Sequence, residues 1–413
     1  MRTDAIIVGA GQAGLAMSRC LSDRAIVHVV LERGRVAERW RSERWDSLRL
    51  LTPNWQTRLP GFQYSGPDPD GFMSMPEVVA FLEGYARSQP APIERDTEVL
   101  ELATDAGGFR LATTRGNWLA PVVILATGYC DEPLVPSIAS RLPADLHQVV
   151  PTRYRRPEDL PDGGVLVVGA SATGIQLAEE IHLSGRPVTL AAGHHTRVPR
   201  SYRSRDIMWW LDASGVLGEA TSEVFDVEVS RQQPSFQLIG RPGAPLDLPA
   251  LARLGVRVVG RLADATADEL TFADDLVATT AAADVKLAGL LARLDTFART
   301  ARIEAAPAAP FEPSWPRFVD APTRLSLRES GIRTILWATG FRRNYSWLNV
   351  PVLDARGEIR HRGGVTFQPG LFAIGLPFLR RRNSNFIDGV GADARVLAAS
   401  VAAHLDERRR AFA

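Results

Sequence analysis

Short apolar runs alternate along this chain with segments in which apolar residues recur at helical spacing. Residues 5–8 (Ala-Ile-Ile-Val) form the first run, residues 9–14 form a glycine turn, and residues 15–21 have helical spacing. A second apolar run over residues 26–31 ends at Glu32. Uninterrupted β-branched runs are typical of parallel strands that are buried on both faces. The pattern predicts a β-α-β unit at the start of an α/β fold.

The same order of elements recurs in the middle of the chain. Residues 164–168 are an apolar run, residues 169–174 are a second glycine turn, residues 175–182 have helical spacing, and residues 187–190 are the next strand. The repeat predicts two Rossmann-like dinucleotide-binding domains in an α/β chain.

Two apolar runs end in Ala-Thr-Gly, at residues 124–128 and 334–340, and one is expected to return behind each glycine turn. The other predicted elements are a helix over 76–86, strands over 97–102, 109–113, 118–125 and 370–375, and a C-terminal helix that opens at 385–395 and runs to about residue 405.

Each glycine of the first turn has a mechanical reason to be glycine. Gly9 permits the tight turn, Gly11 lets a pyrophosphate approach the backbone, and Gly14 lets helix and strand pack closely. Glu32 can accept hydrogen bonds from the ribose hydroxyls of an adenosine. A turn that only connects two elements is the plain alternative, but it does not require the preceding strand, the following helix and the acid together. The unit is therefore predicted to bind a dinucleotide.

The second turn differs from the first in two ways that bear on its ligand. Ser171 replaces the middle glycine, and its hydroxyl can itself bind phosphate. No acid follows the second strand; His195, Arg197 and Arg200 stand there instead, and arginines favour the 2′-phosphate of NADPH over NADH. Solvated loop arginines are the alternative. The residues expected at this second site are Gly169, Ser171, Ala172, Thr173, Gly174, His195, Arg197, Arg200, Ala338, Thr339 and Gly340.

A chain with two dinucleotide sites most often pairs a nicotinamide with FAD, so that hydride passes from one to the other. The helix that opens at residues 385–395 could then place its positive end on the flavin ring, with Asp388 at the flavin or its ribityl chain. An ordinary capped surface helix is the alternative. The residues expected to bind FAD are Gly9, Gly11, Gln12, Ala13, Gly14, Glu32, Arg33, Arg39, Trp40, Thr52, Val99, Thr127, Gly128, Asp388 and Gly391.

The segment over residues 33–55 is dense in arginine and tryptophan and has two interpretations. Because the chain passes over the ligand after the second strand of such a fold, these side chains either line the cofactor or fill a local core.

Composition narrows the classes of partner. A net charge of +1 provides no overall field for nucleic acid or an anionic membrane, and no apolar run reaches the ~18 residues of a membrane span. Cys20 and Cys130 are far apart, which argues against a disulfide framework or a dithiol redox pair, and the histidines suggest no metal centre. A cytoplasmic protein that acts on a small molecule is expected, and a homodimer is left open.

These motifs together resemble the class B flavin-dependent monooxygenases, which include flavin-containing, indole-3-pyruvate and Baeyer–Villiger monooxygenases. The resemblance rests on both glycine turns, Glu32, Trp40, both Ala-Thr-Gly strands and the Gly-Val-Gly-Ala-Asp of residues 389–393. A bacterial branch of this family has the motif His-x-Arg-x-Pro-Arg after the second nucleotide strand, which is matched here by His195, Arg197, Pro199 and Arg200. The family's identifying stretch is represented by His147 and Tyr154.

The resemblance implies a glutathione-reductase-like fold in which the NADPH domain is inserted in the FAD domain, so that the FAD domain has two segments, residues 1–145 and 326–413. It also implies an NADPH domain over residues 146–325 with a variable insert at about 218–313, which is interpreted as a cap or a dimer contact. The implied activity is insertion of one oxygen atom from O2 into a small organic substrate through a C4a-(hydro)peroxyflavin. Arg49 and Arg381 are the candidates to stabilise this peroxide or a substrate carboxylate near the ring. Two other functions are considered: an NADPH-dependent flavin oxidoreductase that passes electrons to a separate acceptor, and a flavin sensor without turnover.

Overall fold

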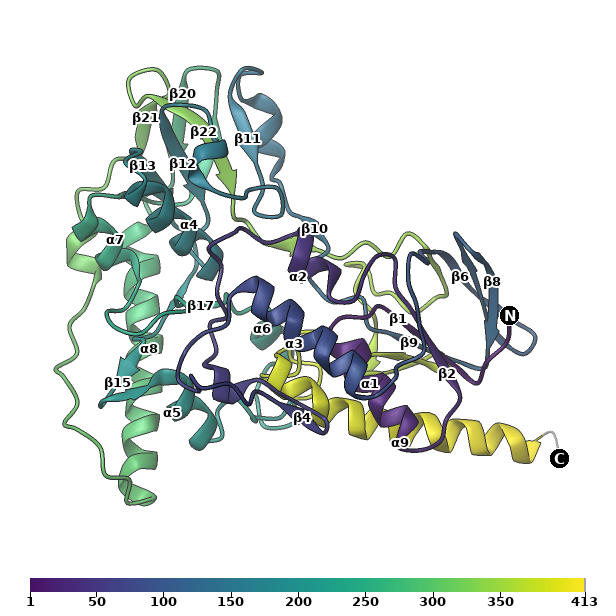
Figure 1. The fold of residues 1–413 in the computed structure, drawn as a ribbon. Helices are drawn as coiled ribbons and strands as arrows, with labels where there is room; N and C mark the ends of the chain where they lie inside the picture. Colours follow the sequence, from purple (N-terminus) through teal and green to yellow (C-terminus); the bar gives the residue numbers. More distant parts are fainter. Residues whose placement is uncertain (412–413) are drawn as a thin grey trace.

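The computed structural model describes residues 1–411 and has two lobes, each with its own β-sheet (Figure 1). Both ends of the chain lie in the first lobe, and the middle of the chain forms the second (Figure 1). The predicted α/β class is confirmed.

The first lobe is organised by a seven-stranded sheet that is parallel from β27 to β5. In spatial order its strands are β25 (His361–Arg362), β26 (Val365–Thr366), β27 (Leu371–Ala373), β9 (Val122–Leu125), β1 (Ala5–Val8), β2 (His28–Leu31) and β5 (Ile93–Glu94). All residues of β1 are buried, which explains its unbroken apolar sequence. The lobe's long helices are α1 (Gln12–Ser22), α3 (Met75–Ser88) and α9 (Ile387–Ala411).

A small sheet lies beside this core and corrects one prediction; it is antiparallel except that β24 pairs with β6 in parallel. Its strands, in spatial order, are β24 (Leu348–Asn349), β6 (Val99–Asp105), β7 (Gly108–Thr113) and β8 (Gly116–Ala120). The single strand predicted over residues 118–125 is wrong, because β8 ends at Ala120 and β9 begins at Val122 in the other sheet. Pro121 separates the two strands, since proline supplies no N–H to a ladder.

The second lobe contains a five-stranded parallel sheet. Its spatial order is β11 (His147–Val149), β22 (Ile332–Trp337), β12 (Gly164–Val168), β13 (Val188–Ala191) and β18 (Arg257–Val259). Helices α4 (Ala172–Leu183) and α7 (Leu248–Leu254) belong to this sheet's core, and β19 (Leu262–Ala265), β20 (Glu269–Phe272) and β21 (Arg324–Ser326) form a separate antiparallel sheet.

The remaining elements are short apart from α8. The helices are α2 (Glu38–Ser42), α5 (Ile207–Ala213), α6 (Val227–Arg231) and α8 (Leu276–Thr300). The 3-10 helices are η1 (Asn54–Gln56), η2 (Ser137–Arg141), η3 (Pro157–Asp159) and η4 (Trp315–Phe318). The two-stranded pairs are β3 (Arg58–Leu59) with β4 (Phe62–Gln63), β10 (Glu132–Pro133) with β23 (Phe341–Arg342), β14 (Thr196–Arg197) with β17 (Phe236–Gln237), and β15 (Ser201–Tyr202) with β16 (Arg205–Asp206).

The sheets place the domain boundaries elsewhere than the sequence did. Strand β22 belongs to the second sheet, and Ile138 and Leu142 are in the core that packs against that sheet. The chain crosses between the lobes at β10 and β23, so the boundaries lie near residues 131 and 340 rather than at 145 and 325. The segment 218–313 is not purely an insert, because it contributes β18 to the parallel sheet; that strand was too short to recognise.

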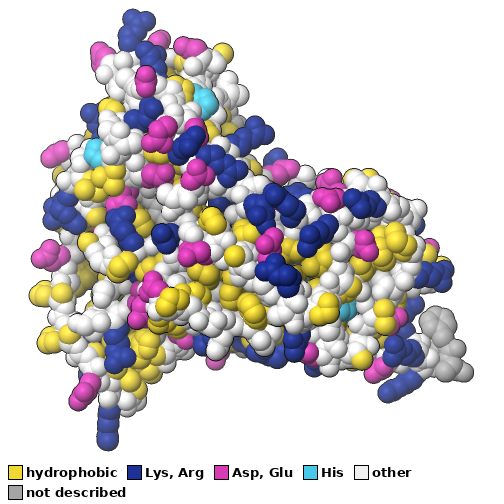
Figure 2. All heavy atoms as spheres, in the orientation of Figure 1, with side chains coloured by type: hydrophobic (Ala, Val, Ile, Leu, Met, Phe, Trp, Pro, Cys, Tyr) yellow, Lys and Arg dark blue, Asp and Glu magenta, His cyan; other side chains and the backbone are white. Residues whose placement is uncertain are grey.

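The molecular surface is mixed in charge. Arginines and acidic side chains are interspersed over both lobes on the face drawn in Figure 2. No helix within residues 1–411 combines the length and the apolar character that crossing a membrane would require.

Candidate functional site

The first glycine turn has the geometry of a phosphate cradle. Gly9 has φ +107°, and a Cβ there would lie 2.7 Å from the Ala126 carbonyl oxygen behind it. A Cβ on Gly14 would lie 1.9 Å from the Gly9 carbonyl oxygen, so helix α1 can pack this close to the turn only if residue 14 is glycine. At Gly11, in contrast, no atom lies within 4 Å of a Cβ position. The space above Gly11 is open, as the approach of a pyrophosphate requires.

The backbone and Glu32 complete this cradle. The N-cap of α1 is Gly11, which has no side chain to bond the N–H groups of the first turn, and no acid stands in that turn. These N–H groups are therefore free for an anion. Glu32 is buried, and its carboxylate accepts hydrogen bonds from the N–H groups of Ala10 (2.7 Å) and Gly34 (3.0 Å). The Thr97 N–H donates to the Glu32 carbonyl, which brings the start of β6, and hence Val99, close to this acid.

Gln12, the first residue of α1, joins two segments that are distant in the chain. The Trp40 indole N–H donates to Gln12 Oε1 (3.1 Å), and Gln12 Nε2 donates to the Asn385 carbonyl just before α9 (3.4 Å). Trp40 is therefore at the first site, whereas Trp45 is 5% exposed and packs into the core of the second lobe. The core-filling interpretation of the arginine- and tryptophan-rich segment is confirmed for Trp45, and the cofactor-lining interpretation stays a prediction for Trp40.

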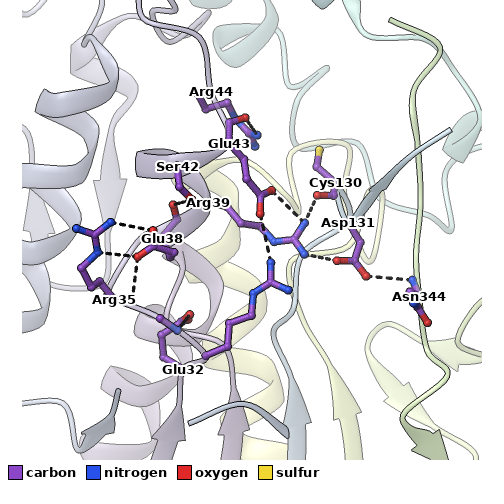
Figure 3. Close-up of polar contacts among 12 residues, drawn as sticks. Glu32, Arg35, Glu38, Arg39, Ser42, Glu43, Arg44, Cys130, Asp131 and Asn344 are labelled. Atoms are coloured by element: carbon purple, nitrogen blue, oxygen red, sulfur yellow. Dashed lines mark hydrogen bonds and ion pairs between the residues drawn. The ribbon is translucent and has the colours of Figure 1, made fainter. Parts of the chain in front are cut away.

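Arg33 and Arg39 are engaged by the protein itself. Figure 3 shows the Arg39 guanidinium directed at the Cys130 carbonyl and the Asp131 carboxylate, and its partners hold the crossing between the lobes. Asp131 also accepts the Asn344 N–H (3.1 Å), and Arg33 pairs with Glu43 (3.3 Å). Their assignment to FAD stays a prediction, and the chain brings acids and a carbonyl to these arginines that sequence spacing does not reveal.

Asp131→Asn is expected to lower the free energy of unfolding by about 1–3 kcal/mol, because it leaves the partly buried Arg39 with only the more distant carboxylate of Glu43 (3.7 Å) as a charged partner. Denaturant unfolding followed by circular dichroism measures this change. Glu101→Gln is the control, since the Glu101–Arg110 pair is about 40% exposed and is expected to contribute under ~1 kcal/mol. Equal stability of D131N and wild type would contradict the role of Asp131 at the crossing.

The start of α9 lies against the segment that follows Pro53. Arg58 holds the Asp388 carboxylate through two hydrogen bonds (2.6 and 3.1 Å), and a Cβ on Gly391 would lie 2.9 Å from the Pro60 ring. Burial raises the pKa of the Asp388 carboxyl, and the Arg58 guanidinium partly offsets the rise. Asp388 is therefore an ion-paired residue at the helix start.

Three buried polar side chains in this segment were missed by sequence reasoning. Gln56 is 1% exposed, and neither atom of its amide has a hydrogen-bond partner within the described residues; the same is true of Asn54 Oδ1 and Thr57 Oγ1. Unpaired buried polar groups are costly, so their concentration points to a ligand with complementary donors and acceptors. An Asn-Trp-Gln-Thr run has no sequence signal for this role. Thr52, two residues before Asn54, is half-buried.

Arg49 and Arg381, the candidate catalytic residues, have protein partners. Arg49 donates to the Phe72 carbonyl (2.8 Å), and Arg381 lies 3.5 Å from the Asp393 carboxylate. Asp393 is fully buried, and burial raises the pKa of its carboxyl. The Arg381 charge thus faces a buried acid.

The second glycine turn repeats the first. Gly169 has φ +110° with its Cβ position 2.3 Å from the Ala338 carbonyl oxygen, and a Cβ on Gly174 would lie 1.8 Å from the Gly169 carbonyl oxygen. Ser171 caps α4 with φ −80° and ψ −173°, against −82° and −173° for Gly11, and it also makes no side-chain cap bond. Each Ala-Thr-Gly strand end, at Ala126 and at Ala338, packs behind its own turn. The predicted equivalence of the two turns is confirmed at this level.

The arginines after β13 do not line this second site. Arg197 pairs with Asp247 (3.1 Å) and Asp284 (2.7 Å). Arg200 is 2% exposed, donates to the Leu51 carbonyl (2.8 Å), and pairs with Asp206. Their contact with a 2′-phosphate stays a prediction, and the geometry does not favour it, because partners distant in sequence neutralise both guanidinium groups.

The other residues expected at the second site lie in different surroundings. His195 is buried, its Nδ1 lies 2.9 Å from the Gly193 carbonyl, and burial lowers the pKa of its imidazole. Thr339 donates to the Leu134 carbonyl at the crossing. His147 is exposed on β11, and Tyr154 is buried with its hydroxyl 3.3 Å from Glu180.

Comparison with known proteins agrees with this geometry. The family model for pyridine nucleotide-disulphide oxidoreductases matches residues 6–212. An oxidoreductase described as CzcO-like, from Geobacillus kaustophilus, is 32% identical over 405 residues, or 97% of this chain and 99% of that protein. A probable indole-3-pyruvate monooxygenase of Arabidopsis thaliana, YUCCA1, is 33% identical over 181 residues, or 43% of this chain and 44% of that protein.

A solved structure has the same fold. The flavin-containing monooxygenase from Stenotrophomonas maltophilia superposes with a TM-score of 0.69 at 18% identity, over 98% of this chain and 99% of that one. The glycine turns, the matching family model and the full-length relative lead to one conclusion: the chain belongs to the pyridine nucleotide-disulphide oxidoreductase family, in its class B flavin monooxygenase-like group.

Proposed function

We propose that this protein is an FAD- and NADPH-dependent monooxygenase that inserts one oxygen atom from O2 into a small organic substrate. The observation that carries the proposal is the pair of equivalent open glycine turns, one on each parallel sheet of a single chain. The titles of similar proteins, which include an indole-3-pyruvate monooxygenase and a flavin-containing monooxygenase, support this reaction class.

The residues of the first lobe fit FAD. The open position at Gly11 and the uncapped start of α1 would receive the pyrophosphate, and Glu32 would receive the adenosine ribose. The unpaired amide of Gln56 and the start of α9 would meet the polar edge of the ring. FAD bound there would accept a hydride and react with oxygen.

The main role of the chain's own residues is to position the cofactors. The Arg58–Asp388 pair balances the acidic charge in the first turn of α9, so the helix N-terminus keeps its favourable field for negative charge. The second turn, with Ser171, would hold the NADPH pyrophosphate on the other lobe. Cys20 and Cys130 are not bonded to each other, and no dithiol is available to relay electrons onward. This favours oxygen over a thiol as the electron acceptor.

Stopped-flow absorbance with the FAD-loaded protein tests the proposal. NADPH is expected to bleach the flavin, and admission of oxygen is expected to return the oxidised spectrum slowly, with little hydrogen peroxide released. Added substrate is expected to speed this reoxidation and to take up one oxygen atom, while the other leaves as water. Immediate reoxidation with stoichiometric peroxide would support an electron-transferring flavin oxidoreductase instead. Failure of NADPH to bleach the flavin would support a sensor without turnover.

A further inference from the structure

A cavity of about 210 Å³ lies at the end of β13 in the second lobe. Three segments line it: the loop after β13 with His194 and His195, the loop after α6 with Gln232 and Gln233, and α8 with Thr279 and Lys286. None of the residues that line this cavity is acidic.

Strand pairing places this cavity beside the second glycine turn. The loop with His195 continues into β14, and the loop with Gln233 continues into β17, its partner strand. The Gln237 side chain of β17 then donates to the carbonyl of Ala170, within the turn (2.8 Å). When a dinucleotide lies on such a turn, its adenosine ribose meets the end of the second strand, which here is β13. The cavity therefore lies on the side of the ribose 2′ position.

Lys286 is the cation at this cavity that is left for an anionic ligand. Its exposed Nζ donates to Gln233 Oε1 (3.3 Å), an uncharged partner, and no ion pair of Lys286 occurs in the described chain. The nearby Asp284 is bound to Arg197 and to the Ser314 N–H and hydroxyl, and it is 4% exposed. A lysine held by a neutral amide keeps its full charge for a phosphate.

We propose that Lys286, with His194 beside it, binds the 2′-phosphate of NADPH and sets the preference for NADPH over NADH. This inference rests on the proposed binding of a nicotinamide dinucleotide at the second turn. The charge that the sequence assigned to Arg197 and Arg200 is supplied instead by the sole lysine of the chain, from a helix some ninety residues later. The two arginines are instead held in ion pairs with Asp247, Asp284 and Asp206.

The test is calorimetric titration of the FAD-loaded protein with 2′,5′-ADP and with 5′-ADP. Lys286→Gln is expected to weaken 2′,5′-ADP binding about tenfold or more and to change 5′-ADP binding less than about twofold. Lys286→Arg is expected to restore most of the affinity. Arg293→Gln, two turns later on α8 and paired with Glu219, removes the same charge from the same helix and is expected to change neither titration.

Equal losses for both nucleotides in K286Q, or no loss for either, would overturn the inference, and so would a wild-type protein that binds both nucleotides alike. Flavin bleaching by NADPH in the same variants separates this result from the proposed function. Bleaching that persists while K286Q keeps its preference for 2′,5′-ADP refutes only the role of Lys286. Absence of bleaching and of nucleotide binding in the wild type refutes both.

Discussion

Gly11→Val is expected to give a folded protein that is purified without flavin and binds added FAD at least about 100-fold more weakly than wild type, a loss of about 2.7 kcal/mol. The Gly11 backbone, with φ −82° and ψ −173°, is an ordinary extended conformation, and no atom lies within 4 Å of its Cβ position. Valine is therefore tolerated by the chain, while its methyl groups fill the space that a pyrophosphate needs. Flavin absorbance and fluorescence titration measure the affinity, and circular dichroism checks the fold.

Ser171→Val is the matched control, because Ser171 has the same backbone conformation in the second turn. This variant is expected to keep its FAD and to lose bleaching by NADPH. Gly14→Val distinguishes a glycine needed for ligand binding from a glycine needed for folding. A Cβ at this position would lie 1.9 Å from a backbone oxygen, so this variant is expected not to fold. Wild-type FAD affinity in G11V would show that the first turn is not the cofactor cradle.

Arg200→Met is expected to lower the free energy of unfolding by about 3–5 kcal/mol, the usual cost of removing one partner of a buried ion pair. Arg200 is 2% exposed, and its loss leaves the Asp206 carboxylate and the carbonyls of Leu51 and Ile239 without this donor. The Phe72 ring, 4.9 Å from the guanidinium carbon, also loses a cation–π contact. Denaturant unfolding and the temperature of flavin release measure the effect.

Arg205→Met is the control for Arg200. Arg205 is an exposed arginine in the same loop, 4.1 Å above the Trp209 ring, and its loss is expected to cost no more than about 1 kcal/mol. Neither variant is expected to alter the ratio of NADPH to NADH affinity. A specific loss of NADPH binding in R200M, with unchanged stability, would show that Arg200 binds the 2′-phosphate.

The sequence by itself determined the two β-α-β units and their glycine turns. Gly9 and Gly169 need positive φ, and Gly14 and Gly174 have no room for a Cβ. Such demands act within a few residues, so they leave a local pattern that can be recognised without knowledge of the remaining fold.

Only the tertiary structure decided what the charged and polar side chains do. Arg197, which the sequence suggested for a 2′-phosphate, pairs with Asp247 and Asp284, while Lys286 lines the cavity at the end of β13. The lobe boundaries and the unpaired Gln56 amide were likewise set by segments far apart in the chain. The physical reason is that an ion pair or a cavity depends on the distance between side chains after packing, and that distance is independent of their spacing in sequence.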